Sequence, residues 1–501
     1  MKPRVILRDC REYDPDRIAS IISEGMEELG IRPRGHTLVK PNTVIAHPRY
    51  FRHAFTRPEF LDGLLTALKQ RGEGMTELVV GERCGITIPT RYSFAEAGYN
   101  AVLRRHRVRA RYFDEEPQVE VRLESPPALR PYTYAARSIV ECDFFVNAPK
   151  FKAQPWVKVT FALKNLIGIQ DDKHRLIDHD YMLEHKIADL QQIVSPGFIA
   201  MDAIIAGEKT MLTPNPFPLG LIVMAVNPVA TDVVCSHIVG LDPREVDYIR
   251  LSAERGLGPL DLDQIEVVGD VTLEGAQARA EGFELTLGTV EDIFNDHQSN
   301  ITTYAGPPPG VSTEPGEVSS KSELAEVPDW YDYCWGGCPG GLFEAVQIIE
   351  ALQPGVYREV RPLCIAFGDV RGRRIDAAPG ERVLFMGDCA MFDGKIAGKP
   401  VHISSIYVSR EQKDPHHAKS SDLLAKILKF LRLWISHRGK QVIHVPGCPV
   451  SVAENVLFVS ALGRTKIPYL DRYIFVHFVY YYVIFNVVRF FRVTLGGLFR
   501  R

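Results

Sequence analysis

The chain alternates short apolar runs with longer amphipathic stretches over most of its 501 residues. Residues 37–42 (TLVKPN) and 77–82 (ELVVGE) have the length and apolar character of buried strands. Between them, residues 58–72 place leucines on one helical face and end at a glycine. Further strand-like runs follow at residues 143–150, 198–205 and 221–227. Strands that alternate with helices predict an α/β fold, in which helices cover a sheet.

Residues 305–327 interrupt this pattern, because they are rich in Pro, Gly, Ser and Glu and contain almost no bulky apolar side chains. Such a composition is typical of a linker. We therefore predict four parts in the chain. They are an α/β domain over residues 1–300, a linker over 301–328, a second α/β domain over 329–465 and an aromatic, basic tail over 466–501.

The second domain has strand-like runs at residues 362–369, 382–388 and 441–447, each with a glycine at or near its end. Helical stretches lie between these runs. We therefore expect an α/β unit with a parallel sheet. In such sheets, ligands bind outside the carboxyl ends of the strands.

Four cysteines of this domain fall in predicted turns. Cys334 and Cys338 enclose Trp-Gly-Gly just before a helix, whereas Cys389 and Cys448 each follow a strand. Four thiolates at one sheet edge can ligate a [4Fe–4S] cluster. A structural zinc ion is one alternative, although zinc prefers closely spaced pairs, and four cysteines without a metal are another. Cys364 lies within an apolar run and is expected in the core.

Two segments support the cluster by resemblance. GDCA at 387–390 and VIHVPGCPVSVAENVLFVSALG at 442–463 resemble the iron–sulfur small subunit of nickel–iron hydrogenases and a related subunit of NADH:quinone oxidoreductase. The resemblance implies a flavodoxin-like domain that binds a cubane through Cys334, Cys338, Cys389 and Cys448. Three residues separate the first two cysteines, where hydrogenases have two, so the choice between Cys334 and Cys338 stays open. The resemblance implies an electron relay and no nickel–iron site on this chain.

The first domain carries a different set of motifs. They are VKPN at 39–42, TRPEF at 56–60, VNAPKFKAQ at 146–154, TFALKNLIG at 160–168, MDAIIAGE at 201–208, NPVATDVV at 227–234 and GLGPLD at 256–261. In this order and spacing they resemble the family named domain of unknown function 362 (DUF362). The resemblance implies a domain of that family and supplies no reaction.

Several charged residues of these motifs are candidate catalytic residues. Four lysines lie at or just after predicted strand ends: Lys40, Lys150, Lys152 and Lys164. If the strands are parallel, the lysines converge on one cleft, and several ammonium groups there favour an anionic ligand, a carboxylate or a phosphate. Asp202 and Glu208 can move protons or hold a metal. The alternative for each lysine alone is a solvated surface charge.

Two further segments are less specific. Residues 171–185 contain His174, His179 and His185, but the spacing does not place them on one helical face, which favours a polar loop. Residues 473–488 are aromatic and apolar and are followed by arginines. This run is short for a bilayer span, so we expect it to lie in a membrane interface or to pack against protein.

These observations predict an iron–sulfur redox protein. We expect it in the cytoplasm, since the first residues lack the apolar core of a signal peptide. Membrane association, if present, would be on the cytoplasmic face. The cluster would exchange electrons with an anionic small molecule in the first domain or with a redox partner protein. Alternatives are a non-catalytic electron-transfer or assembly subunit, and a transferase, racemase or lyase with a structural cluster. The composition shows no basic stripe, so we expect no nucleic-acid partner.

Overall fold

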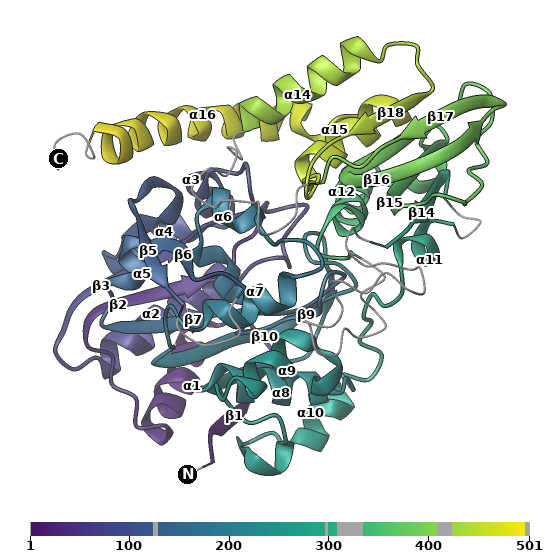
Figure 1. Ribbon diagram of the computed structural model, residues 1–501. Helices are drawn as coiled ribbons and strands as arrows, with labels where there is room; N and C mark the ends of the chain where they lie inside the picture. The colour runs from purple at the N-terminus through teal and green to yellow at the C-terminus, as the bar shows by residue number, and fades with distance from the viewer. Residues whose placement is uncertain (1, 124–128, 296–298, 308–333, 408–422, 496–501) are drawn as a thin grey trace. The chain divides into compact units, whose positions relative to one another are not determined.

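A computed structural model describes the chain except residues 1, 124–128, 296–298, 308–333, 408–422 and 496–501 (Figure 1). The chain divides into two compact units. The first comprises Met1–His174, Glu184–Thr286 and Val476–Arg501, and the second comprises Arg175–Leu183 and Leu287–Phe475. Both contain a sheet with helices, which confirms the predicted α/β class.

The main sheet of the first unit runs through eight strands in spatial order. They are β13 (Glu266–Gly269), β1 (Arg4–Asp9), β12 (Leu221–Ala225), β10 (Phe198–Glu208), β7 (Phe144–Ala148), β2 (Gly35–Pro41), β3 (Met75–Glu82) and β4 (Arg109–Tyr112). The strands from β10 to β4 are parallel, whereas β12 is antiparallel to both β1 and β10. Four shorter strands are β5 (Gln118–Arg122), β6 (Tyr132–Ala136), β9 (Lys158–Thr160) and β11 (Asn215–Phe217).

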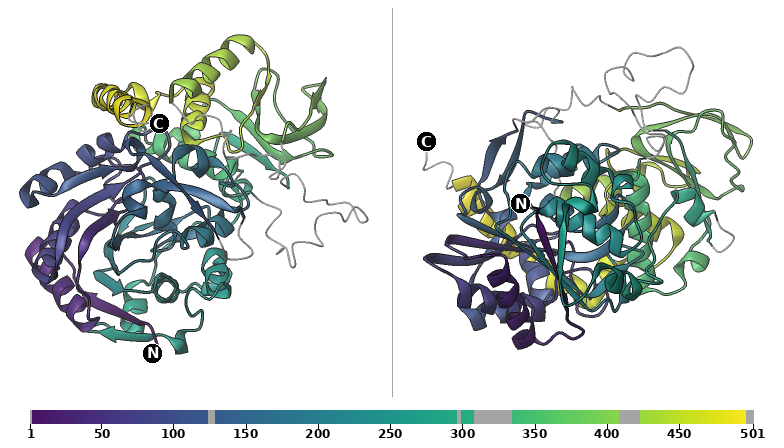
Figure 2. Two further views of the ribbon diagram at one scale, coloured as in Figure 1. Left: turned by 60° about the vertical axis from the view of Figure 1, so that its left-hand side comes forward. Right: turned by 90° about the horizontal axis from the view of Figure 1, so that it is seen from below.

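Helices flank this sheet (Figure 2). The leucines of α2 (Pro58–Arg71) are fully buried, and with α1 (Pro15–Glu28) they form one core against Val39 of β2 and Val80 of β3. The helix after Asn227 is α8 (Pro228–Ile238), and the Asn227 side chain accepts the N–H of Ala230 at 2.8 Å. Shorter helices are α3 (Thr90–Glu96), α4 (Tyr99–His106), α5 (Arg137–Val140), α6 (Asp172–Leu176), α7 (Leu183–Leu190), α9 (Asp247–Glu254) and α10 (Leu273–Arg279).

Two of the predicted lysines, Lys150 and Lys152, occupy a different position relative to the strands than the sequence predicted. β7 ends before Pro149, and β8 (Lys150–Gln154) begins directly after it and pairs in parallel with β10. Lys150 and Lys152 therefore lie within a strand, not after one. Proline has no N–H to continue the β7 ladder, which explains why the chain changes partner there. The new pairing sets Lys150 opposite Asp202.

The sheet of the second unit has four parallel strands in the order β14 (Ile301–Ala305), β15 (Leu363–Asp369), β16 (Arg382–Ile396) and β18 (Val442–Val445). β17 (Lys399–Ile403) pairs antiparallel with the second half of β16. The three strands predicted here are confirmed. β14 lies in residues predicted as linker, and most of that predicted linker lies outside the described residues.

The helices of this unit match the predicted helical stretches. α12 (Cys338–Leu352) packs against α15 (Val452–Gly463), and α14 (Leu423–Ser436) also contacts α15. Two short helices, α11 (Val290–Phe294) and α13 (Val356–Glu359), complete the unit. The predicted tail forms α16 (Arg472–Arg489), most of which belongs to the first unit.

Candidate functional site

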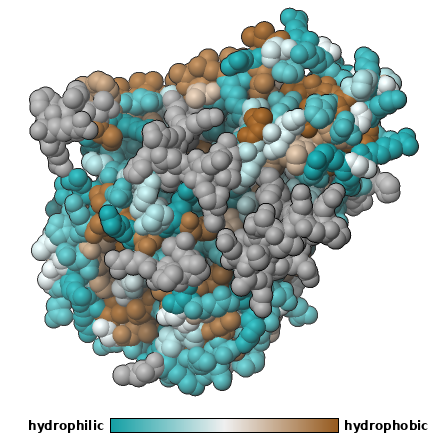
Figure 3. All heavy atoms as spheres, in the orientation of Figure 1, coloured by the Kyte–Doolittle hydropathy of each residue, from teal (hydrophilic) through white to brown (hydrophobic). Residues whose placement is uncertain are grey.

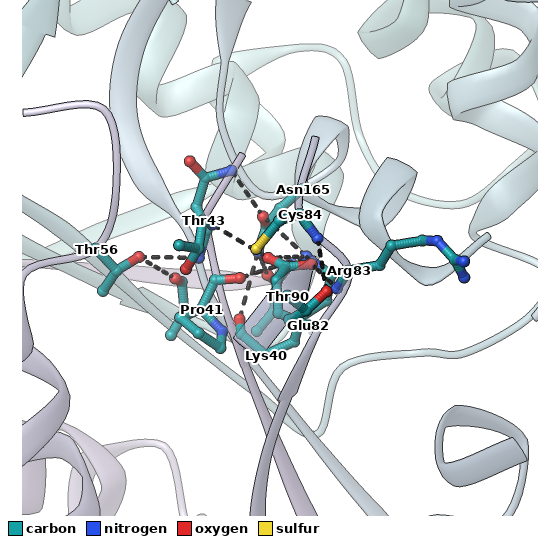
Figure 4. Close-up of polar contacts among 12 residues, drawn as sticks. Lys40, Pro41, Thr43, Thr56, Glu82, Arg83, Cys84, Thr90 and Asn165 are labelled. Carbon is teal, nitrogen blue, oxygen red and sulfur yellow. Dashed lines mark hydrogen bonds and ion pairs between the residues drawn. The ribbon is translucent and has the colours of Figure 1, made fainter. Parts of the chain in front are cut away.

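A buried ion pair joins the ends of two neighbouring strands in the first unit (Figure 4). Lys40, near the end of β2, lies 2.8 Å from the carboxylate of Glu82, the last residue of β3. Both side chains are at most 2% exposed. Lys40 Nζ also donates to Asn165 Oδ1 at 3.2 Å, and the amide of Asn165 donates to Asn147 at 2.8 Å. The Lys40 ammonium is therefore bound by a carboxylate and an amide.

A second buried ion pair follows from the register of β8 and β10. Lys150 Nζ lies 2.9 Å from Asp202 Oδ2, and both side chains are fully buried. Tyr13 donates its hydroxyl to Asp202 at 2.8 Å and accepts from Lys150 at 2.9 Å. Burial lowers the pKa of Lys150, against the opposing effect of Asp202. Burial, and then the Asp202 charge, raises the pKa of Tyr13 well above its usual value.

One segment, residues 54–57, links the two ion pairs. Lys152 donates to the Ala54 carbonyl at 2.6 Å, and the N–H of Asn42 donates to Thr56 Oγ1 at 3.0 Å. The N–H of Arg57 donates to Asp202 at 3.0 Å. Lys40, Lys150, Lys152 and Asp202 therefore belong to one polar network, which we call the lysine network.

The other predicted residues lie at its edge or apart from it. Lys164 begins the 3-10 helix η2 (Lys164–Ile169), and its ammonium lies 5.7 Å from the centre of the Trp156 ring. Gly168 of η2 packs against Lys40 and Glu82 with no room for a Cβ atom. Glu208 is half-buried and accepts the N–H of Glu284 at 3.1 Å, so it serves a different contact.

Sequence reasoning missed three members of the lysine network: Glu82, Tyr13 and Arg57. Glu82 had a signal, because an acid at the carboxyl end of a buried strand needs a partner when it is itself buried. Tyr13 and Arg57 had none, since they are far from Asp202 in sequence. Asp232, in α8, accepts the N–H groups of Ala162 and Leu163 at 2.8 and 3.1 Å.

Cationic side chains near Lys150 are paired with acids, Lys150 with Asp202 and Arg57 with Glu59. His53 lies nearby, and its pKa is lowered to about 4 by burial first and then by the charges of Lys150, Arg57 and Arg52. His53 Nδ1 is buried and has no hydrogen-bond partner among the described residues. Two surface pockets of this unit, of about 360 and 380 Å³, are lined by other residues.

Cys338, Cys389 and Cys448 of the second unit lie near the carboxyl ends of its parallel strands. Cys338 is the first residue of α12, and Cys448 follows β18. Cys389 lies within β16, at an irregularity in its pairing with β15. Phe367 of β15 pairs with Met386 of β16, whereas Asp369, two residues later, pairs with Met391. Residues 387–390 therefore bulge out of the sheet at the edge where Cys448 also lies, which confirms the shared edge predicted for these two cysteines.

Glycines let these thiols approach one another. Gly387 has φ +111°, and a Cβ atom added to it would lie 3.3 Å from the Cys389 sulfur and 3.4 Å from that of Cys338. A Cβ atom on Gly337 would lie 2.8 Å from the Cys334 sulfur. Any larger residue at these positions would occupy the space beside the sulfurs. The sequence pattern of glycine next to cysteine therefore has a steric reason.

Residues 175–183 contribute an acid to this group. His179 Nδ1 lies 2.7 Å from the Gly336 carbonyl, and Gly336 packs directly on the Asp180 backbone. Asp180 Oδ2 lies 3.9 Å from the Cys448 sulfur. The segment predicted as a polar loop thus contains the short helices α6 and α7, with His179 and Asp180 between them. Asp180 carried no signal in the sequence, being far from every cysteine.

Neighbouring thiols lie close enough to raise the pKa of Cys334 and of Cys338. Burial is the largest cause for Cys334, followed by the charges of Asp180, Cys389, Cys448 and Cys338. The pKa of Cys338 is raised by burial and then by Cys389. Burial raises that of Cys389 to about 11. We call Cys334, Cys338, Cys389 and Cys448 the cysteine group.

The donor set of the cysteine group has the chemistry of a cluster site. The N–H of Val450 donates to the Cys338 sulfur at 3.2 Å, and the N–H of Gly368 lowers the pKa of Cys389. Such N–H donors are the contacts that stabilise cluster thiolates. Among the described residues, no three His, Cys, Asp or Glu side chains lie close enough to share one metal ion. A cubane gives each thiolate its own iron, so its ligands stand farther apart than those of one tetrahedral zinc ion.

Comparison with known proteins identifies part of the first unit. Residues 37–237 match the profile of the family described as Domain of unknown function (DUF362). These residues are a DUF362 domain. The matched range contains the whole lysine network except Tyr13, so the network is a feature of this domain.

Two individual proteins are also similar. A thylakoid-associated protein from Synechocystis sp. is 21% identical over 275 residues, which cover 52% of this chain and 81% of that protein. The lactate racemase apoprotein from Thermoanaerobacterium thermosaccharolyticum is 11% identical, with a TM-score of 0.31 over 73% of this chain and 69% of that chain.

Proposed function

We propose that the second unit binds one [4Fe–4S] cluster through Cys334, Cys338, Cys389 and Cys448, and that the protein is a redox protein. A cluster supplies storage and transfer of single electrons. The observation that carries the proposal is the gathering of four thiols, from three separate segments, at one edge of a parallel sheet, with backbone N–H groups aimed at their sulfurs.

The electrostatics of the cysteine group support this proposal. Burial and the neighbouring thiols and acids all raise the pKa of Cys334, so four thiolates together are unfavourable there without positive charge. Iron supplies that charge, and binding it releases the thiol protons. The motifs around Cys389 and Cys448, which resemble those of hydrogenase small subunits, support the same chemistry.

The first unit is proposed to bind the electron-exchanging partner, an anionic small molecule, beside Lys150. Burial lowers the pKa of His53 to about 4, and the charges of Lys150, Arg57 and Arg52 add to that effect while Asp202 opposes it, so these three cations lie close enough to act at this place. An anion with a carboxylate or phosphate group would be stabilised there. We propose Lys150 and Arg57 as its binding residues, and His53, with its unpartnered Nδ1, as a hydrogen-bonding group.

The cluster is tested on anaerobically purified protein by iron and sulfide content and by EPR after reduction. Wild type is expected to hold about four irons and to show a cubane signal. Cys389→Ala and Cys448→Ala are expected to lose both. Cys364→Ala is the matched control, because Cys364 is fully buried in the same sheet and lies outside the cysteine group. Zinc in place of iron, or cluster loss in Cys364→Ala as well, would overturn the assignment.

The anion site is tested separately on the reduced, cluster-loaded protein. Anions that carry a carboxylate or phosphate together with a reducible group are added one at a time as electron acceptors, and reoxidation of the cluster is followed by EPR. A productive anion reoxidises the wild type, and Arg57→Gln is expected to prevent this while iron content stays unchanged. If the anion reoxidises wild type and Arg57→Gln equally, the proposed anion site is wrong, but the proposed cluster is not affected.

A second candidate function is a non-catalytic electron-transfer or assembly subunit. It is favoured by the saturation of the lysine network, where Lys40, Lys150 and Lys152 already contact carboxylates and carbonyls of the chain itself. In that case no anion reoxidises the cluster, and the protein purifies in a stable complex with a redox partner. Size-exclusion chromatography of the natively produced protein distinguishes the two.

A further inference from the structure

Helix α16 has an apolar stripe on each of two opposite sides. Its inner side packs on α3, where Phe478 and Tyr481 lie 5.5 and 6.4 Å from the Tyr92 ring, centre to centre. His477 Nδ1 lies 3.0 Å from the carboxylate of Glu96, whose side chain is 2% exposed. These contacts hold α16 against the first unit.

The opposite side of α16 is exposed and apolar. Its residues recur at helical spacing and continue into the short segment η9 (Phe490–Leu495): Val476, Val479, Tyr480, Val483, Val487, Phe490 and Phe491. We call them the outer stripe. Each is between 40% and 60% exposed. Figure 3 shows hydrophobic residues gathered along this helix. A stripe of this length is larger than the isolated apolar side chains that are normal on a soluble surface.

Positive charge lies beside the outer stripe. Arg472 and Arg489, at the two ends of α16, are both exposed. Arg489 lies over the Phe485 ring at 5.7 Å. Valine, tyrosine and phenylalanine with flanking arginines are the composition of helices that lie in the interface of anionic membranes. Arginine there meets lipid phosphate, and the aromatic rings fit the headgroup region.

The segment Arg472–Val493 is also long and apolar enough to cross a bilayer, with a mean hydropathy of 1.6. The contacts of the inner side argue against that arrangement. A helix that crossed the membrane would leave α3 and carry His477 into hydrocarbon, and the buried carboxylate of Glu96 would lose its partner. Lying in the interface keeps both contacts and covers only the outer stripe.

We propose that the outer stripe of α16 docks the protein onto an anionic phospholipid bilayer, with the helix axis in the plane of the membrane. The second unit exposes a stripe of the same kind on α14, formed by Leu424, Leu428, Leu431 and Ile435. These residues are 44% to 72% exposed, while Lys426 and Phe430 on the other side of α14 are buried. A lipid surface is the occupant whose chemistry both stripes share. This inference does not depend on the cluster.

The test is cosedimentation of the full chain with phospholipid vesicles. Vesicles of phosphatidylcholine with phosphatidylglycerol are expected to bind the wild type more strongly than phosphatidylcholine alone, and added salt is expected to weaken that binding. Val483→Glu with Val487→Glu removes the apolar contact and should lower the partition coefficient at least about tenfold. The matched control is Leu287→Glu, an equally exposed leucine far from α16 in the sequence. Circular dichroism verifies that both variants are folded.

Three outcomes would overturn the proposal. Wild type that binds neither vesicle type has no membrane-docking stripe. A dimer in solution that the Val483→Glu, Val487→Glu variant converts to monomer assigns the outer stripe to a second copy of the chain. Protein that alkaline carbonate does not release from vesicles has inserted α16 across the bilayer, which contradicts docking in the plane.

Discussion

The lysine network and the cysteine group both bring together ionisable side chains from distant segments of the chain, yet they differ in how charge is compensated. In the lysine network two lysines each face a carboxylate, Lys150 facing Asp202 and Lys40 facing Glu82. In the cysteine group the neighbours that act on Cys334 are other thiols and Asp180, and each of them raises its pKa.

In the lysine network, lysines and carboxylates already compensate one another. In the cysteine group, a bound cation would stabilise the deprotonated thiols. A buried ion pair is stable only when both partners stay, because removing one leaves an uncompensated charge in a poorly polarisable interior. A group of buried thiols remains neutral by keeping its protons, and it gains from a positively charged group that replaces them. Mutations in the lysine network should therefore mainly lower stability, whereas mutations in the cysteine group should mainly lower metal content.

The largest effect on stability is expected at Asp202. Asp202→Asn keeps the size of the side chain and one acceptor oxygen, but it replaces one of the two oxygens that accept from Tyr13 and the Arg57 N–H and leaves Lys150 without its charge partner. We expect unfolding of the first unit to become easier by about 3 kcal/mol, measured by urea denaturation with circular dichroism. Asp263→Asn, at an exposed position, is the control and should change stability by less than about 0.5 kcal/mol. If Asp202→Asn lowers the free energy of unfolding no more than Asp263→Asn does, the Lys150–Asp202 ion pair does not stabilise this unit.

The next prediction concerns Glu454 and tests whether the second unit also contains a buried charge that is compensated by opposite charges. Glu454, in α15, lies 2.9 Å from Lys426 and 2.6 Å from Lys429, and its capping box with Ser451 holds the turn that follows Cys448. Burial opposes ionisation, but the two lysines outweigh it and lower the pKa of Glu454 from 4.5 to about 2.

A lowered pKa in the folded state stabilises the fold above the unfolded pKa, and this contribution is lost as pH falls toward 2. Glu454→Gln should therefore cost about 3 kcal/mol at neutral pH and almost nothing near pH 2. Urea denaturation at both pH values measures the difference. A cost that is the same at both would assign the effect to lost packing, not to the charge.

The smallest effect on stability is expected in the cysteine group itself. In iron-free protein, Cys389→Ser with Cys448→Ser should change the free energy of unfolding by about 1 kcal/mol or less, because neither thiol compensates a charge there. After anaerobic reconstitution with iron and sulfide, the thermal midpoint of wild type should rise and that of the variant should not. If the iron-free variant is destabilised as much as Asp202→Asn, the contrast between the two regions fails.

Much of the secondary structure and the edge that carries Cys389 and Cys448 could be predicted, because both depend on local patterns. A buried strand needs a short apolar run, a helix needs apolar residues at helical spacing, and a glycine beside a cysteine marks a close approach. The helix after Asn227, the three strands of the second unit and the polar character of the strand ends all follow from such patterns.

The partners of the buried charges depended on the tertiary structure. Glu82 is 42 residues from Lys40, Tyr13 is 189 residues from Asp202, and Asp180 is 268 residues from Cys448. No local pattern specifies such pairs, because they form only when sheet register and loop packing bring two distant segments together. The sequence by itself determined which residues lie at the strand ends. The tertiary structure decided which of them compensate one another, as Lys150 and Asp202 do.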